Sequence, residues 1–370
     1  MKKDKIVIIG ANDFQNQLII KAKARGMETH VFAWEKGAVG KKNADFFYPI
    51  SIIEKEKILQ ICREIQPNGV VSIASDLAAL TVNYIAEKLN LIGNGMDSAR
   101  VSTNKYLMRK AFEKRGDPSP KCYYSDELSN INFKSLRWPL IVKPVDRSGS
   151  RGITKISDLA DLSSAIRSAE KESFSKKAIV EEFVEGEEFS VEYISYKGVH
   201  TFLALTKKYT TGAPHFIETG HVQPAAVSDE ILNKIKGIVE HALDTLMIKN
   251  GASHSELKVD NNGKIKIIEI GGRMGGDCIG SDLVQLSTGV DFINMVIDVA
   301  CGRKPVFKKV CVPQKAEVRF IFNQEDINQL ERIKLKNPES LYRVSDIDII
   351  DSEHPVTDSS TRYGYYIVRG

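Results

Sequence analysis

The chain has 370 residues, of which 42% are hydrophobic and 27% are charged, values typical of a soluble globular protein. That length predicts two to three domains rather than one small core. The 52 basic and 48 acidic residues are mixed along the chain and give a net charge of +4. Because no basic block with interleaved aromatic residues occurs, nucleic-acid binding is not predicted. No segment approaches the ~20 apolar residues of a membrane span, so no membrane partner is predicted.

The cysteines are odd in number and include no CxxC pair; they are Cys62, Cys122, Cys278, Cys301 and Cys311. This pattern favours free thiols in a reducing compartment over a disulfide framework or a zinc site. The apolar run that follows Lys2-Lys3 is too short for a signal peptide. We therefore predict a cytoplasmic protein.

Short apolar runs alternate with segments of helical spacing through the first ninety or so residues. Strands are predicted at Lys5–Ile9, Thr29–Ala33 and Gly69–Ala74, and helices at about Phe14–Arg25, at Glu54–Gln66 and up to about Leu89. This alternation predicts an open parallel sheet with flanking helices.

The turns of this first region hold the next candidates. Asn12 and Gln15 stand where a G-x-G-x-x-G motif needs glycines, so the evidence for a dinucleotide site is weak. Ligands of open parallel sheets still gather at the carboxyl ends of the strands. Asn12, Ser75 and Asp76 are therefore candidate substrate contacts, although roles as helix N-caps explain them at least as well.

A lysine lies in each of the next two predicted elements. The helix Asp97–Arg115 contains Lys105, which by itself fits a solvated face. The strand Trp138–Pro144 contains Lys143 inside an apolar run, where a lysine is costly unless it has an anionic partner. The following loop, Arg147–Gly152, is rich in glycine and serine, and its backbone N–H groups suit a phosphate. It lacks the Walker A pattern, and a hairpin turn is the alternative, but lysine and loop together favour phosphate binding.

The acidic segment Glu181–Glu188 is predicted as a strand, a bend at Gly186 and a second strand. Its acidity alone fits an ordinary surface. A bend that offers the backbone groups of Val184 and the carboxylate of Glu188 would also suit an adenine edge and ribose hydroxyls.

Glu218 and His221 are three residues apart, as in half of a helical metal site. Pro214, Gly220 and Pro224 favour a loop or strand there, and no second Glu/His pair is near. Zinc is therefore not predicted.

The stretch from His254 to Asp277 carries the strongest local pattern. Its strand-like runs Ser255–Val259 and Lys264–Ile270 flank Asp-Asn-Asn-Gly, and Asn-Gly between apolar alternations is a strong hairpin signal. Glu256 and Glu269 lie on the two strands and come side by side if they face the same way. Two such carboxylates repel unless a cation lies between them, and their oxygens suit Mg²⁺ bound together with nucleotide phosphates. An ordinary hairpin with a solvated face is the alternative.

A glycine-rich turn, Gly271–Asp277, follows the hairpin and contains Arg273. Its glycines allow close approach of a ligand, and arginine is a fork-shaped donor for phosphate or carboxylate. Asp277 either receives a cationic group of a substrate or caps the next helix. Helices are then predicted at Ser281–Gly289 and Phe292–Ala300, and strands and turns in the last ~70 residues, the size of a subdomain.

Taken in order, these pieces resemble the ATP-grasp superfamily over essentially residues 1–300. The resemblance implies a pre-ATP-grasp α/β domain with a parallel sheet at 1–96 and a two-subdomain α+β ATP-grasp fold at 97–300, with a lid at about 121–187. A small strand-rich C-terminal subdomain would follow at 301–370. The turn Gly271–Asp277, with Glu218-Thr219-Gly220-His221 upstream, is most similar to the L-amino-acid (dipeptide-forming) ligase branch.

The resemblance also implies the site. The ATP phosphates would contact Lys105 and Lys143, under a loop of Ser148, Gly149, Ser150 and Gly152. Adenine would be held by Glu181, Phe183 and Val184, ribose by Glu188, and Mg²⁺ by Glu256 and Glu269. Catalysis would involve Arg273, Lys143 and His221, and the substrates would contact Glu218, His221, Arg273, Gly275, Gly276 and Asp277. Many members have Glu-x-Asn-x-Arg; here Gly271 replaces the Asn, so one metal ligand is missing.

The predicted activity is the ATP-dependent joining of a small-molecule carboxylate, such as that of an amino acid, to an amine. The reaction would pass through an acyl phosphate and release ADP and phosphate. A homodimer is left open. One alternative is a purine-pathway enzyme of the same superfamily that acts on a ribonucleotide, for which Asn12-Asp13 and Ser75-Asp76 make a poor anion cradle. The other is a non-catalytic nucleotide-binding module, which need not retain Lys105, Lys143, Glu256, Glu269 and Arg273 together.

Overall fold

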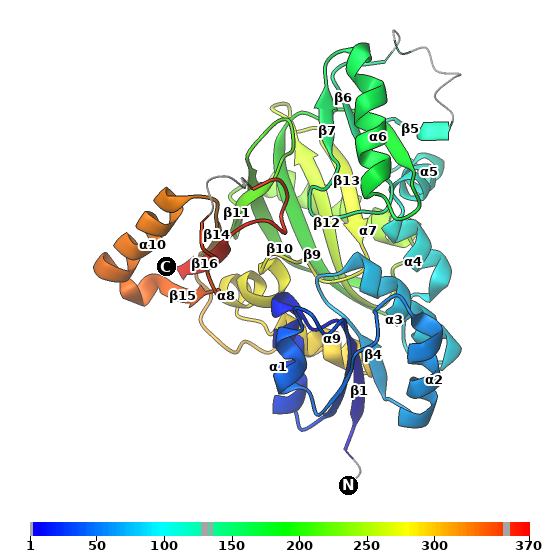
Figure 1. Cartoon of the computed structure of the whole chain (residues 1–370), viewed down its shortest axis with the longest axis vertical. Coiled ribbons are helices and arrows are strands. Elements are labelled where there is room, and N and C mark those ends of the chain that lie inside the picture. The colour runs from blue at the N-terminus through cyan, green and yellow to red at the C-terminus, as the bar shows by residue number, and fades with distance from the viewer. Residues whose placement is uncertain (1–2, 127–132, 134–135, 351–355) are drawn as a thin grey trace.

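The computed structural model describes residues 3–126, 133, 136–350 and 356–370. Residues 127–132 and 134–135 of the predicted lid, and 351–355 of the predicted C-terminal subdomain, lie outside the described part. The described residues form three sheets with helices packed against them (Figure 1). An α/β domain with a parallel sheet is followed by antiparallel sheets, which confirms the predicted fold class.

The first domain is a four-stranded parallel sheet with strand order β3-β2-β1-β4. Its elements are β1 (Lys5–Ile9), α1 (Asp13–Ala24), β2 (Glu28–Phe32), η1 (Val39–Asn43), β3 (Phe46–Tyr48), α2 (Lys55–Ile65), β4 (Gly69–Val71) and α3 (Asp76–Lys88). After Lys5, the four remaining residues of β1 are apolar and buried, as expected for a strand covered on both faces. Asn12 and Ser75 cap α1 and α3.

Two helices, α4 (Gly95–Thr103) and α5 (Lys105–Arg115), replace the single helix predicted at Asp97–Arg115. The break falls at Asn104, whose backbone is extended and whose side chain accepts a hydrogen bond from the N–H of Leu107. This cap starts a new helix and places Lys105 in its first turn.

The segment predicted to be a lid, and called the lid below, forms an antiparallel sheet with strand order β5-β8-β6-β7. Its elements are β5 (Cys122–Tyr124), β6 (Leu140–Pro144), β7 (Thr154–Ile156), η4 (Leu159–Asp161), α6 (Leu162–Glu172) and β8 (Ala178–Glu182). The apolar face of α6 packs on this sheet through Leu162, Ala165 and Ala169. The Gly/Ser loop connects β6 to β7 and therefore belongs to the lid.

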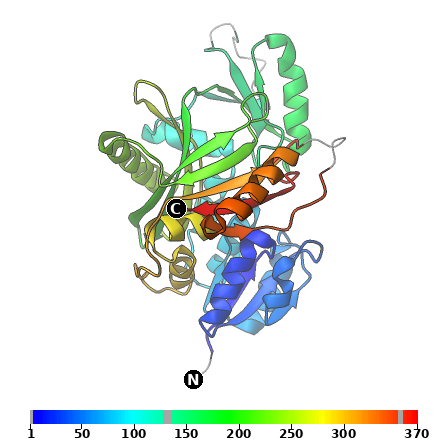
Figure 2. The same ribbon diagram turned by 90° about the vertical axis from the view of Figure 1, so that its left-hand side faces the viewer.

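The largest sheet has eight strands in the order β13-β12-β9-β10-β11-β14-β16-β15. Its strands are β9 (Glu187–Tyr196), β10 (Val199–Thr210), β11 (Glu218–Gln223), β12 (Gly251–Val259), β13 (Ile265–Gly271), β14 (Ala316–Ile321), β15 (Leu341–Val344) and β16 (Gly364–Arg369). The helical segments beside it are α7 (Asp229–Thr245), η5 (Ile279–Leu283), α8 (Val284–Thr288), α9 (Phe292–Ala300), α10 (Gln324–Lys336) and η6 (Pro338–Ser340). β14, β16 and β15 extend the sheet that holds the predicted hairpin, so the C-terminal region shares its backbone hydrogen bonding (Figure 2).

α10 corrects the expectation of only strands and turns near the C-terminus. Asn323 and Asp326 form a capping box at its start, and Leu330 is buried against Ile321 and Tyr366. Much of the remaining helix surface is polar, which is why its apolar spacing was inconspicuous. Within the part of the chain that the structure describes, no helix is long and apolar enough to cross a membrane.

Candidate functional site

A cavity of about 450 Å³ lies where the first domain, the lid and the large sheet meet. Most of the predicted site residues line it: Lys105, Lys143, Ser148, Gly149, Ser150, Glu181, Phe183, Val184, Glu188, Glu218, His221, Glu256, Glu269, Arg273, Gly276 and Asp277. Gly152 and Gly275 are not among its lining residues. Gly275 instead packs on Glu192, whose carboxylate accepts a hydrogen bond from its N–H.

Each of the two predicted phosphate lysines already has a carboxylate partner. The Lys105 ammonium donates to Glu269 at 2.8 Å and to the carbonyl of Arg147 at 2.7 Å. Lys143 lies 2.7 Å from Glu181, which also pairs with Arg109 at 2.8 Å. Burial alone would raise the pKa of Glu181, but Arg109 and Lys143 outweigh it and hold that pKa below its ordinary value. Lys143 thus has the anionic partner that a buried lysine requires.

Glu256 and Glu269 are register partners on β12 and β13, so their side chains share one face. Their side chains are 23% and 22% exposed, respectively, and both line the cavity. Among the described residues, no three His, Cys, Asp or Glu side chains are arranged to hold a metal ion by themselves. Mg²⁺ is normally held by one or two carboxylates plus substrate phosphates, and these two glutamates fit that role.

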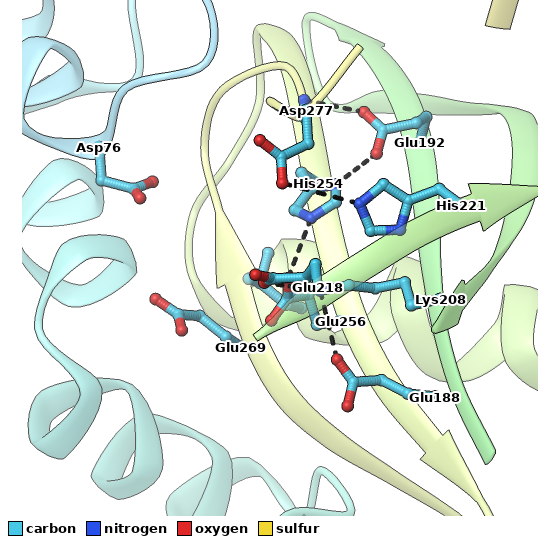
Figure 3. Close-up of polar contacts among 12 residues, drawn as sticks. Asp76, Glu188, Glu192, Lys208, Glu218, His221, His254, Glu256, Glu269 and Asp277 are labelled. Carbon is cyan, nitrogen blue, oxygen red and sulfur yellow. Dashed lines mark hydrogen bonds and ion pairs between the residues drawn. The ribbon is translucent and has the colours of Figure 1, made fainter. Parts of the chain in front are cut away.

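Lys208 of β10 is a central residue of the cavity that the sequence analysis did not identify. Its ammonium contacts Glu256 and lies 3.2 Å from Glu188 and 3.8 Å from Glu218. Figure 3 shows Lys208 among these carboxylates. Burial disfavours its charged form, but these three carboxylates outweigh burial and raise its pKa well above the ordinary value. A lysine inside the apolar run FLALTKKY was the available signal, of the same kind that marked Lys143.

His254 joins the same network from β12. One ring nitrogen contacts the buried carboxylate of Glu192, and the other lies 3.3 Å from Glu256 (Figure 3). Burial opposes protonation of the ring, yet Glu192 and Glu256 outweigh it and raise its pKa to about 9. The imidazole is therefore cationic at neutral pH and holds Glu256 in place.

Arg273 is bound by the first domain. Asp76 accepts two hydrogen bonds from its guanidinium, at 2.7 and 2.9 Å. This bidentate geometry orients the guanidinium at the cavity wall. Asp76, predicted as a substrate contact or a helix cap, instead positions Arg273, and the cap of α3 is Ser75.

Asp277 does not cap a helix. Cys278 is the residue that precedes η5, and no side chain caps that segment. The Asp277 carboxylate accepts hydrogen bonds of 2.9 and 2.8 Å from Arg362 and lies 3.7 Å from the ring of His221. Burial alone would raise its pKa, but Arg362 and His221 lower it well below the ordinary value. The cation predicted beside Asp277 is thus a residue of the chain itself.

The segment Asp358–Arg362 closes one side of the cavity, and nothing in its sequence marked it as functional. Ser359 donates to Glu218 at 2.6 Å, and its N–H lies 3.4 Å from the carbonyl of Gly149. Ser150, in the same Gly/Ser loop, donates to the carbonyl of Phe216 at 3.0 Å. The Gly/Ser loop and the C-terminal segment therefore contact one another beside the carboxylate of Glu218.

Comparison with known proteins agrees with this arrangement. Residues 136–282 match the model of the ATP-grasp domain. Over 297 residues the chain is 27% identical to alanine–anticapsin ligase of Bacillus subtilis (strain 168), an alignment that covers 71% of this chain and 63% of that protein. The chain thus spans less than two thirds of the length of this curated relative.

Two solved structures show the same fold over the whole chain. An L-amino acid ligase from Bacillus licheniformis superposes with a TM-score of 0.81 at 23% identity, covering 100% of this chain and 94% of that one. A carboxyaminoimidazole ribonucleotide synthase from Aspergillus clavatus, complexed with ATP, gives 0.79 at 16% identity, with coverages of 100% and 94%. At these identities the likeness concerns the fold. The chain therefore shares its fold with these two proteins, and its residues 136–282 match an ATP-grasp domain.

Proposed function

We propose that the protein is an ATP-dependent ligase that joins a small-molecule carboxylate to an amine through an acyl phosphate. The observation that carries the proposal is the facing pair Glu256 and Glu269, set beside Lys105 and Arg273 in one cavity under the Gly/Ser loop. This combination provides ligands for Mg²⁺, donors for phosphates and a cover, which a structural hairpin would not need.

The proposed role of each residue follows from its charge: carboxylates would bind Mg²⁺, and lysine and arginine would bind phosphate groups. Bound Mg²⁺ would neutralise the phosphates and make the terminal phosphorus a better electrophile. Glu256 and Glu269 would hold the ion, and Lys105 and Lys143 would bind the phosphate oxygens. The carboxylate oxygen attacks the terminal phosphorus and ADP leaves; the amine then attacks the acyl carbon and phosphate leaves. Arg273 would stabilise negative charge at the acyl phosphate.

The loop and the nucleotide end of the cavity fit the remaining requirements. Ser148, Gly149 and Ser150 line the cavity and would cover the phosphates, keeping water from the acyl phosphate. Phe183 stacks on Phe216 with ring centroids 5.6 Å apart and lines the same cavity, beside Val184. An apolar wall of this kind suits a purine ring.

Amino acids are the proposed substrates. The first domain supplies Asn12, Phe14, Ala74 and Ser75 to the described cavity wall, and none of these is basic. A ribonucleotide would bring an additional phosphate that requires cationic donors, whereas an amino acid needs only a few polar contacts. The resemblance to amino-acid ligases in sequence and fold supports the same choice. The five free cysteines fit a reducing cytoplasm.

A substrate screen tests the proposal. Purified protein with Mg-ATP is given pairs of amino acids, phosphate release is recorded, and the amide product is identified by mass. We expect release that requires an amino acid and yields a product joined by loss of water. The rival purine function, which the likeness to the ribonucleotide synthase favours, predicts release only with a ribonucleotide substrate. That outcome would overturn the proposed function.

A further inference from the structure

Lys208 occupies the position of a cation inside the proposed metal site. Its ammonium is surrounded by Glu256, Glu188 and Glu218 from three different strands, and its side chain is only 3% exposed. Three carboxylates this close repel one another strongly unless a positive charge lies between them. In this chain the charge is covalently attached to β10, so it is present before any metal arrives.

Gly271 has no room for the side chain that would serve a second metal ion. A Cβ atom at this position would lie 2.9 Å from Asp76 Oδ1 and 3.3 Å from Arg273 Cζ. Both groups are fixed by their bidentate ion pair. An asparagine in this place, as in the common Glu-x-Asn-x-Arg pattern, would therefore collide with the pair that orients Arg273. Having glycine instead of asparagine at position 271 therefore removes a metal ligand and at the same time leaves space for the carboxylate of Asp76.

We propose that Lys208 supplies the second positive charge of the site, so that the protein binds one divalent cation with its nucleotide instead of two. This inference rests on the proposed function, because it assumes that a nucleotide binds beside Glu256 and Glu269. Glu256 and Glu269 would hold that metal ion together with the nucleotide phosphates. The ammonium of Lys208, which already contacts Glu256, would neutralise the remaining carboxylates without requiring a second set of ligands.

The side of β10 on which Lys208 lies distinguishes it from its neighbour. Lys207 points to the other face, where it pairs with Glu187 and lies over the ring of Phe189. It is not among the residues that line the cavity. Lys207→Met is thus a matched control, since it removes one lysine from the same strand and leaves the carboxylate cluster intact.

Metal counting tests the inference. The probe is Mn²⁺, counted by the loss of its free electron paramagnetic resonance signal. The nucleotide is the non-hydrolysable imido analogue of ATP, kept below the protein concentration so that all of it is bound. We expect one Mn²⁺ per bound nucleotide in the native protein and in Lys207→Met. We expect two in Lys208→Met, where three carboxylates have lost their internal cation.

Thermal unfolding without nucleotide provides a second measurement. Mg²⁺ should raise the Tm of Lys208→Met by several degrees and leave that of the native protein nearly unchanged, because a hard cation then replaces the missing ammonium. Two Mn²⁺ per nucleotide in the native protein, or an unchanged count in Lys208→Met, would overturn the inference and leave the proposed function standing. Failure to bind the nucleotide at all would overturn both. If Lys208→Met does not fold, the native count of one or two still decides.

Discussion

Cationic side chains around the cavity are held in place by carboxylates before a ligand binds. Lys105 pairs with Glu269, Lys143 with Glu181, and Arg273 with Asp76. Free lysine and arginine side chains lose up to about 2 kcal/mol of rotamer entropy when they are fixed. Because these side chains are fixed by folding, less of that cost falls on substrate binding. The price of such preorganisation is that removing one partner leaves the other charge buried and unpaired.

Glu269→Gln tests the residue at the centre of this arrangement. The amide keeps the shape of the side chain but cannot bind Mg²⁺ as a carboxylate does and no longer pairs with Lys105. We expect phosphate release to slow by about 10²–10³-fold. The protein should still fold but with a lower Tm, because Lys105, which is only 5% exposed, loses its carboxylate partner. Glu187→Gln is the control, because that side chain is 67% exposed. Near-normal turnover in Glu269→Gln would contradict its assignment to the metal.

His221 predicts a pH dependence of stability. Its burial lowers the pKa of the imidazole, so the folded protein keeps the ring neutral below the ordinary value of 6.5. The unfolded chain takes up a proton there, so the free energy of unfolding should fall as the pH drops from about 6.5 through the lower folded pKa, and not above that range. Urea unfolding between about pH 7 and pH 5 measures this slope.

His221→Gln should flatten this dependence, whereas the exposed His215→Gln should leave it unchanged. Equal slopes in the two variants would show that the pH dependence arises elsewhere.

At the scale of elements, the C-terminal segment Asp358–Arg362 forms a clasp: it contacts both the Gly/Ser loop of the lid and residues at the large sheet. Arg362 holds Asp277 and also lies over the ring of Phe320, 3.6 Å from its centroid. Earlier in this segment, Ser359 contacts Gly149 of the Gly/Ser loop, and Asp358 lies near Arg151 of the same loop. Order in the loop is therefore coupled to a segment more than two hundred residues away.

Arg362→Met should break this clasp. The substitution leaves the carboxylate of Asp277 buried without its bidentate partner, which typically costs about 3–5 kcal/mol. Amide hydrogen exchange should become faster in the Gly/Ser loop as well as in the C-terminal segment. Arg369→Met, at the exposed end of β16, is the control. Adding Asp277→Asn should restore part of the lost stability, and a double variant no more stable than Arg362→Met would contradict the pairing.

Elements with a strong local pattern could be predicted from the sequence. β1 has the bounds read from its apolar run, and the hairpin of β12 and β13 follows its Asn-Gly turn. Failures occurred where a local signal was overridden or absent. One polar residue, Asn104, divided a helix by capping its second half, and the sparse apolar face of α10 did not reveal a helix.

Site residues divide in the same way. Lysines and glutamates within recognisable patterns could be placed in the cavity, whereas their partners depend on contacts distant in sequence. Lys208 and Glu256 are 48 residues apart, and Asp277 and Arg362 are 85 apart. Periodicity describes one element at a time, so it does not report which charge from another element will neutralise a buried group.

At the scale of the whole molecule, the first domain is joined directly to the proposed catalytic centre. The N–H of Ala74 donates to the carbonyl of Met274, and Asp76 binds Arg273. Asp13 of α1, also in the first domain, accepts hydrogen bonds from Arg343 and Tyr365 of the C-terminal strands. Movement of the first domain relative to the large sheet would therefore displace Arg273. The proposed substrate contacts in that domain and the proposed charge stabilisation at the acyl phosphate would then be mechanically linked.

Substitutions at two neighbouring glycines, Gly271 and Gly272, can distinguish the linkage through Arg273 from a general effect on the turn Gly271–Asp277. A Cβ at Gly271 would approach Asp76 Oδ1 to 2.9 Å, whereas one at Gly272 would meet nothing closer than 3.5 Å. Neither residue has a positive φ, so alanine fits the backbone at both positions. Gly271→Ala should push the Asp76 carboxylate away from Arg273 and lower kcat about tenfold or more, equivalent to about 1.4 kcal/mol, with a smaller change in KM for ATP. Gly272→Ala should behave like the native protein. Equal kinetics and equal Tm for the two variants would mean that the first domain does not need to hold Arg273, and the coupling between domains would have to be carried by the contacts of Ala74 and Asp13 alone.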